Sequence, residues 1–337
     1  MSLKKAGNIA LPFLLGGAIL WWMYRNTDFT EIEHTVMHDM DWGWMLFSLI
    51  FGVTAQLFRG IRWTQMLSPI GERPRMSTCI HAVFISYASS LIIPRSGELA
   101  RCGVLARYDG TSFLKSLGTV VTERIIDSAL ILIITAIVIL SQMPVFTTFF
   151  SQTGVSLSAW LHEFTITGYI VTAICAVAVC IMAWYLLRRL AIYNKVKTTI
   201  GGIVQGAMSL RKVKNVPLFV VLTLAIWLSY FLHYYLTFFC FEQTSHLGMA
   251  CALVTFIVGS IAVIVPTPNG AGPWHFAVKT MLILYGVGET EALNFVLIVH
   301  SVQTLLVIML GIFAWTMLSF TRRKGTTATE KEQVLTT

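Results

Sequence analysis

Charged side chains are scarce in this sequence: Asp, Glu, Lys and Arg make up 12% of 337 residues, whereas 56% are hydrophobic. The mean hydropathy of +0.73 implies far more apolar surface than one soluble core can bury. We therefore predict an all-α polytopic membrane protein. The formal charge of +8 does not indicate nucleic-acid binding, because Lys and Arg lie between apolar runs and not on a compact basic domain.

Motifs for catalysis and metal binding are missing as well. The chain has no HExxH, no GxSxG, no clustered aspartates and no evident nucleotide site. Its six cysteines lie in or beside apolar segments without CxxC or Cys/His spacing, which predicts buried small side chains. We expect no catalytic residue, no metal and no cofactor. An intramembrane hydrolase or a transferase acting on lipid phosphates remains the alternative, since such enzymes also keep His, Glu and Asp inside the bilayer.

The apolar runs predict six full spans and two re-entrant broken hairpins. The spans cover about residues 9–24, 42–66, 111–140, 165–187, 216–241 and 291–320, and the hairpins about 77–108 and 249–285. The acidic segment 25–41 is expected to be an external loop. Lys and Arg concentrate in the predicted inner segments, whereas the predicted outer loops hold only Arg25. The positive-inside rule therefore predicts that both termini face the cytoplasm.

The predicted domain organisation is one transmembrane domain, residues 1–325, with a disordered tail at 326–337. Its halves, about 1–141 and 165–320, are joined through an outer loop at 142–164, and a basic cytoplasmic linker covers 188–215. Spans beginning near residues 42 and 216 are 174 positions apart, and Pro94 and Pro266 are 172 apart. Broken segments at matching places in halves of opposite orientation predict an inverted-topology repeat with a midplane site.

The first break puts a Pro, a Gly and three charges where an apolar segment should continue. Its candidate site residues are Arg95, Ser96, Gly97, Glu98 and Arg101. Hydrocarbon cannot satisfy these groups, so they must face protein or a water-filled cavity. A helix that starts after the break points unpaired amides at the membrane centre, which favours an anion.

The second break follows residue 265 and is rich in Pro and Gly. Its candidates are Asn269, Gly270, Gly272 and His275. The ring of His275 could pair with His300, and Gln303 shares the His300 face because it lies three residues further along.

Two further charged pairs lie within predicted helices. Arg59 and Arg62 share a helical face, where they either bind a lipid phosphate bidentately or extend to the cytoplasmic surface. Glu123 and Asp127 would repel each other at i, i+4 unless a cation such as Arg95, Arg101 or Arg124 lies beside them. The alternative for every charged candidate is a purely structural ion pair.

Taken in order, these motifs resemble the flippase-like transmembrane domain of lysylphosphatidylglycerol synthases, the bacterial multiple peptide resistance factors, and its stand-alone relatives. The resemblance covers most of the chain. It rests on four anchors, namely the runs 59–63, 94–98 with Arg101, 123–127 and 266–272. Two departures are His275, where many relatives have Glu, and the lack of an attached aminoacyl-transfer domain.

The resemblance implies a transporter in the bacterial inner membrane, moving anionic, aminoacylated or polyprenyl-linked lipids between leaflets. The expected partners are membrane lipids with phosphate headgroups, and a homo-oligomer or a lipid-modifying enzyme partner is compatible with the sequence. Synthesis of the modified lipid is not expected. A membrane partner without transport activity would account for the basic linker but not for two charged helix breaks.

Overall fold

The computed structural model describes residues 3–25, 27, 29–142, 213 and 215–321. Every regular element in these ranges is a helix, as predicted. Four helical segments are long and apolar enough to cross a membrane, namely Trp42–Ile70, Phe113–Ser141, Val216–Cys240 and Glu289–Ser319. The predicted span 165–187, the loop 142–164, nearly all of the basic linker and the tail lie outside the described residues.

The first half of the described chain contains five main helices. They are α1 (Leu3–Tyr24), α3 (Trp42–Leu67), α4 (Met76–Ile92), α5 (Gly97–Asp109) and α6 (Phe113–Ser141). Asp41 caps α3 by accepting hydrogen bonds from the amides of Gly43 and Trp44, and Ser112 caps α6. These caps satisfy backbone groups that the first turn of a helix leaves unpaired.

The second half repeats this order of long and broken helices. It comprises α11 (Val216–Tyr235), α13 (Gly248–Ala262), α14 (Pro273–Leu284) and α15 (Glu289–Ser319). Short turns connect the main helices: η2 (Ser68–Ile70), η4 (Leu236–Cys240), α12 (Glu242–Ser245) and η5 (Pro268–Gly270).

The segment 25–41, which was predicted to be an external loop, contains regular structure. The segment folds into α2 (Phe29–His34) and the π-helix η1 (Thr35–Asp39). The Trp42 indole donates to the carbonyl oxygen of Val36, and the Asp41 amide donates to that of Cys240. Tertiary contacts with the end of α11 and η4 therefore order a segment whose polar composition had indicated a loop. The prediction for the cysteines is confirmed at Cys79, Cys102, Cys240 and Cys251, which are buried and free.

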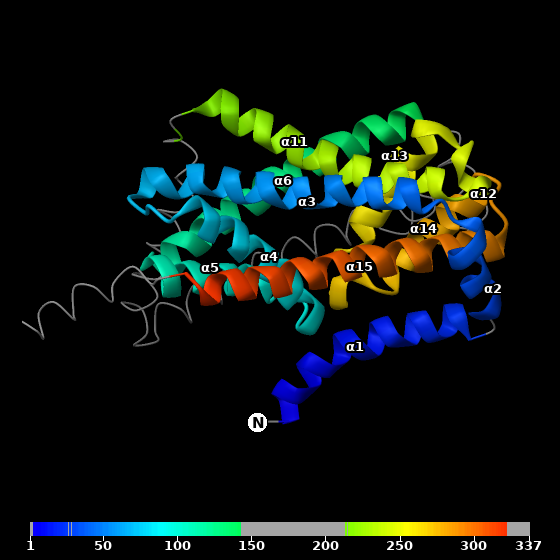
Figure 1. Ribbon diagram of the computed structural model, residues 1–337, viewed down its shortest axis with the longest axis horizontal. Coiled ribbons are helices and arrows are strands. Elements are labelled where there is room, and N and C mark those ends of the chain that lie inside the picture. The colour runs from blue at the N-terminus through cyan, green and yellow to red at the C-terminus, as the bar shows by residue number, and fades with distance from the viewer. Residues whose placement is uncertain (1–2, 26, 28, 143–212, 214, 322–337) are drawn as a thin grey trace, which may run out of the picture.

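Figure 1 shows the long helices α3, α11 and α15 along the longest axis, with the α4/α5 pair toward one end and α13/α14 toward the other. The packing is reciprocal between the halves. Helix α3 packs on α11, α4 on α15 and α13 on α6. The contact between α3 and α4 in the first half corresponds to that between α11 and α13 in the second. The contact between α5 and α6 corresponds in the same way to that between α14 and α15.

Small residues let these helices approach closely. A Cβ atom on Gly60 of α3 would lie 2.8 Å from the Ile80 backbone of α4, and one on Gly311 of α15 would lie 2.4 Å from the Ala88 side chain. Packing and not a hydrophobic drive holds helices together in lipid, so such close approaches stabilise the fold. They fix α4, and with it the first break, against two spanning helices.

Candidate functional site

The first break lies between the end of α4 at Ile92 and the start of α5 at Gly97, as the sequence predicted. Arg95 adopts a left-handed backbone with φ 62°, a conformation that is strained for a residue with a long side chain. The Ser96 hydroxyl donates to the Ser89 carbonyl oxygen at 3.0 Å, which anchors the turn to α4. The strained turn directs Arg95 away from its own hairpin.

The second break also contains a residue other than glycine in the left-handed region. Asn269 in η5 has φ 52°, and Asn tolerates this conformation better than most residues. Its side-chain amide donates to the Thr304 hydroxyl at 2.8 Å, and its carbonyl oxygen lies 3.1 Å from His300 Nε2. The Thr304 hydroxyl lies 3.5 Å from His300 Nδ1, which closes a ring of contacts between η5 and α15.

This ring gives a testable expectation for Thr304→Val, which keeps the side-chain shape but removes the hydroxyl. The Asn269 amide then loses its acceptor, a loss of about 1–3 kcal/mol for a partly buried donor. We expect faster hydrogen exchange at the amides of residues 269–271. Thr280→Val is the matched control, because its hydroxyl bonds only within α14; equal exchange in both variants would contradict the anchoring role.

A cavity of about 610 Å³ lies between the two breaks. Its wall combines residues of α4, α5 and α6 with residues from the end of α13 and from the second break. Of the predicted site residues, those that line it are Arg59, Arg95, Glu98, Arg101, Arg124, Asp127, Asn269 and Gly270. The two breaks therefore share one cavity, as the sequence pattern suggested.

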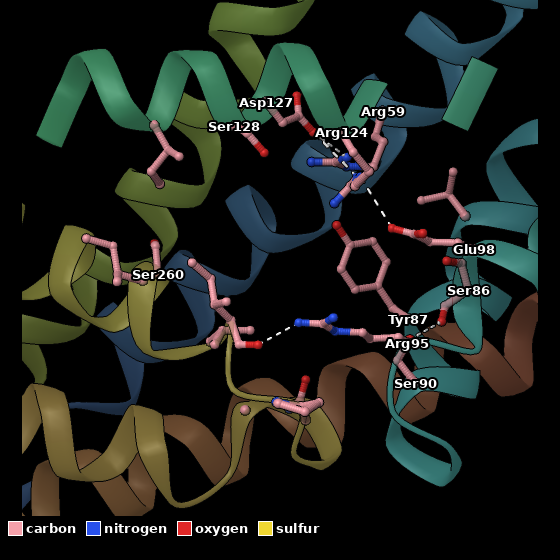
Figure 2. Close-up of a pocket in the computed structure, with 18 of the residues that line it drawn as sticks. Arg59, Ser86, Tyr87, Ser90, Arg95, Glu98, Arg124, Asp127, Ser128 and Ser260 are labelled. Atoms are coloured by element: carbon pink, nitrogen blue, oxygen red, sulfur yellow. Dashed lines mark hydrogen bonds and ion pairs between the residues drawn. The ribbon is translucent and has the colours of Figure 1, made fainter. Parts of the chain in front are cut away.

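Arg95 crosses this cavity. In Figure 2 its side chain extends from the first break toward the segment that follows α13, where its guanidinium donates to the Ile264 carbonyl oxygen at 2.6 Å. Arg95 has no acidic partner in the described part of the chain, and the residue is exposed. A single neutral acceptor thus holds a cation in the middle of the cavity.

Glu123 lies at the centre of a buried ion-pair cluster beside the cavity. Its carboxylate is fully buried and lies 2.5 Å from Arg59 Nη1, 2.8 Å from Arg124 Nη2 and 3.1 Å from Arg101 Nη1. Arg62 Nη2 is 3.6 Å away. One acid therefore holds guanidinium groups from α3, α5 and α6 in place.

Asp127 extends the same cluster by one helical turn. It accepts from Arg59 at 2.9 Å and from Arg62 at 3.0 Å, and it lies 3.4 Å from Arg124. Arg62 also donates to the Thr223 hydroxyl of α11 at 3.1 Å. Four arginines relieve the repulsion expected between Glu123 and Asp127. The prediction that a cation lies beside these acids is confirmed for Arg101 and Arg124. Arg95, the third candidate, does not belong to the cluster.

Aromatic rings fix the orientation of the guanidinium groups. Arg101 lies over the Trp63 ring at 4.8 Å, and the Trp63 indole donates to the Thr119 hydroxyl at 2.9 Å. Arg59 lies over the Tyr230 ring at 5.7 Å, and Tyr230 hydrogen-bonds Tyr87. Cation–π contacts of this kind stabilise a desolvated cation without neutralising its charge.

Several guanidinium donors in the cluster remain unused. Four donors are buried without a hydrogen-bond partner among the described residues: the Nε atoms of Arg59, Arg62 and Arg101, and Nη2 of Arg101. Arg101 lines the cavity although only 2% of its surface is exposed. Buried donors normally have a hydrogen-bond partner. Positively charged donors without one are suited to an anionic ligand, because such a ligand can accept their hydrogen bonds.

The remaining predicted residues stand behind the cavity wall. Arg62 and Glu123 form an ion pair directly behind the wall. Ser96 and Gly97 belong to the turn of the first break. Gly272 (φ 91°) packs on Gly16 of α1. The predicted pairing of His275 and His300 is present, with ring centroids 4.4 Å apart, but these rings support the second break. Gln303 is half-buried on α15 and does not line the cavity.

Sequence reasoning did not single out several polar and aromatic residues of the wall. They are Ser86, Tyr87, Ser90, Ser128, Trp227 and Ser260. Ser86 and Ser90 lie four residues apart on one face of α4, and polar residues at that spacing within an apolar segment were the available signal. No group of His, Cys, Asp and Glu among the described residues has a geometry suited to a metal ion.

Comparison with known proteins gives a single assignment. Searches of curated proteins and of solved structures found no match. The family model described as the lysylphosphatidylglycerol synthase TM region matches residues 9–311, a range that includes both helix breaks and the whole ion-pair cluster. The chain thus belongs to the lysylphosphatidylglycerol synthase transmembrane-region family.

Proposed function

We propose that this protein moves phospholipids between the leaflets of the bacterial inner membrane and binds the lipid headgroup in the cavity between the two breaks. The observation that carries the proposal is a cavity within apolar helices whose wall holds four arginines. Charge inside a membrane is expensive, and it is retained where it binds or conducts a polar substrate. The family assignment supports a lipid-related role.

The proposal includes an inverted repeat with α4/α5 and α13/α14 as re-entrant hairpins and both termini in the cytoplasm. The reciprocal helix packing supports it, because the contacts α3–α4, α4–α15 and α5–α6 have the counterparts α11–α13, α13–α6 and α14–α15. The left-handed residues Arg95 and Asn269 are 174 positions apart, close to the 174 and 176 that separate the starts of α3 from α11 and of α6 from α15. A substrate site at the interface of such halves is the arrangement expected of alternating access.

Arg95 is the residue through which substrate binding would act on the conformation. A phosphate accepts charge-assisted and bidentate hydrogen bonds from a guanidinium, which are stronger than one bond to a neutral carbonyl. A headgroup that enters the cavity would therefore compete with Ile264 for Arg95. Release of that contact would separate the two breaks and allow the halves to move.

The proposal is tested with purified protein in liposomes that contain a fluorescently labelled phospholipid. Dithionite destroys the label in the outer leaflet only, so protein-dependent movement appears as loss of the protected fraction. Mass spectrometry of the recovered lipid serves as the second readout. Chemical conversion of the lipid without movement would contradict a transporter and favour the intramembrane enzyme.

For Arg95→Ala we expect the transport rate to fall about 10- to 100-fold, the range for loss of one hydrogen bond to a charged group. Arg95→Lys should retain part of the rate, since it keeps the charge but not the bidentate geometry. Arg107→Ala is the matched control, because Arg107 is exposed near the end of α5 and away from the cavity. An unchanged rate in Arg95→Ala, with normal membrane insertion, would refute the site.

A further inference from the structure

We infer that the cavity selects a headgroup that carries two negative charges, and that it discriminates against lipids with a single phosphodiester charge. The inference rests on the proposed function and specifies the substrate class of the same site. It derives from the number and placement of the charges around the cavity. A phosphate monoester and a pair of linked phosphodiesters both meet this requirement.

The cavity wall carries more positive than negative charges. Four guanidinium groups line it, those of Arg59, Arg95, Arg101 and Arg124, against the carboxylates of Glu98 and Asp127. Arg62 and Glu123 lie directly behind the wall, and their charges cancel. The described residues thus leave an excess of two positive charges, and arginine does not lose its proton to remove it.

Two of the four wall arginines are desolvated. Arg101 and Arg59 are 2% and 4% exposed, and neither uses its Nε donor. Each acid in the cluster is shared: Glu123 contacts four arginines and Asp127 three. Opposite charges attract more strongly where water is excluded. A ligand with two negative charges, which neutralises the whole excess, is therefore favoured over a ligand with one negative charge.

Two cationic side chains of the first hairpin face the cavity, Arg95 from the break and Arg101 from α5, and Arg101 keeps unused donors although it is paired with Glu123. Arg95 reaches into the cavity from the break, and Arg101 offers buried donors from the second turn of α5. Glu98, which is half-exposed and 3.6 Å from Arg124 Nε, is the weakest internal counter-ion on the wall. The charge of the cavity can therefore be changed at Arg95 and at Glu98 without disrupting the buried cluster.

The experiment measures binding of short-chain lipids to the detergent-purified protein by titration calorimetry. All probes carry octanoyl chains. Phosphatidic acid has two chains and a monoester phosphate, phosphatidylglycerol has two chains and one phosphodiester, and cardiolipin has four chains and two phosphodiesters. At pH 8 we expect phosphatidic acid or cardiolipin to bind at least tenfold more tightly than phosphatidylglycerol. Equal affinities for all three, or a preference for phosphatidylglycerol, would overturn the inference.

A pH series separates the two sources of double charge. The second ionisation of a phosphate monoester has a pKa of about 6, so phosphatidic acid loses close to one charge between pH 8 and pH 5. If the monoester is the ligand, its affinity should fall toward that of phosphatidylglycerol at pH 5. If linked phosphodiesters are the ligand, cardiolipin binds most tightly and its affinity stays constant over this range.

Two cavity variants test the charge argument in opposite directions. Arg95→Gln reduces the excess to one and should narrow the preference for the doubly charged lipid to about threefold, whereas Glu98→Gln raises the excess and should widen it. Arg107→Gln, outside the cavity, should leave the preference unchanged. A shift of the same sign in Arg95→Gln and Glu98→Gln would show that the charge excess does not set selectivity.

Transport measured on the same preparations keeps the two claims separate. Rapid movement of phosphatidylglycerol, with no preference for doubly charged lipids, would overturn this inference and leave the proposed function intact. A clear binding preference without movement of any lipid would overturn the proposed function and leave this inference intact.

Discussion

Glu123→Gln is expected to lower the free energy of unfolding by about 3–5 kcal/mol, the loss seen when one member of a buried ion pair is removed. The substitution keeps the size of the side chain but removes the charge that Arg59, Arg101 and Arg124 share. Asp127 is then the only acid left in the cluster; it contacts Arg59, Arg62 and Arg124, and Arg101 loses its carboxylate partner. Thermal or denaturant unfolding in detergent, followed by tryptophan fluorescence, measures the effect.

Glu98→Gln is the matched control for Glu123→Gln, because it makes the same chemical change at a half-exposed position on the cavity wall. We expect a change below about 1 kcal/mol, as for other exposed ion pairs. A second check is the double variant Glu123→Gln with Arg101→Gln, which removes one uncompensated cation and should recover part of the loss. Equal stability of Glu98→Gln and Glu123→Gln would disprove the central role of Glu123.

Gly97→Ala is expected to abolish most transport. A Cβ atom at this position would lie 2.0 Å from the Ser86 carbonyl oxygen and 2.6 Å from the Ser90 hydroxyl. Neither contact is tolerable, and the nearer one is with backbone, so the first turn of α5 must move away from α4. Overpacking of this kind destabilises by about 1–3 kcal/mol, and it also displaces the charged residues on either side of Gly97.

Gly103→Ala makes the same change two turns further along α5, where a Cβ atom meets nothing within 4 Å. It should preserve transport and, because Ala favours a helix over Gly, slightly stabilise the protein. The liposome assay described above reports transport, and unfolding in detergent reports stability. Normal transport in Gly97→Ala would show that the close contact between α4 and α5 is dispensable for the site.

The positions of the breaks could be predicted because they are local in the sequence. Pro94 has no backbone N–H and cannot continue α4 without loss of a hydrogen bond, and Gly272 with Pro273 defines the start of α14. The same local rules predicted the ends of the long helices within a few residues. They did not predict α2 and η1, because those elements depend on contacts with residues far along the chain.

The ion-pair cluster was only partly predictable. Two acids at i, i+4 required a cation, and that rule correctly anticipated Arg101 and Arg124. It could not identify Arg59, which lies 64 residues from Glu123 and meets it only because α3 packs against α6. Arg59 and Arg62 were predicted either to bind a lipid phosphate or to extend to the cytoplasmic surface; both are buried between helices, and Arg59 lines the cavity. Their environment depends on how the helices pack, and this packing cannot be predicted from a single sequence.

The size of the cavity has a consequence for substrate range. A volume of about 610 Å³ is in the range that accommodates one drug-sized molecule, so it can enclose a phosphate and its immediate substituents but not two long hydrocarbon tails. In the proposed transport, the tails remain outside the protein while the polar end passes through it. Recognition is confined to the polar end, and lipids that differ only in chain length or unsaturation should be equivalent substrates. Such a protein would serve one class of headgroup through any change in the fatty-acid composition of the membrane.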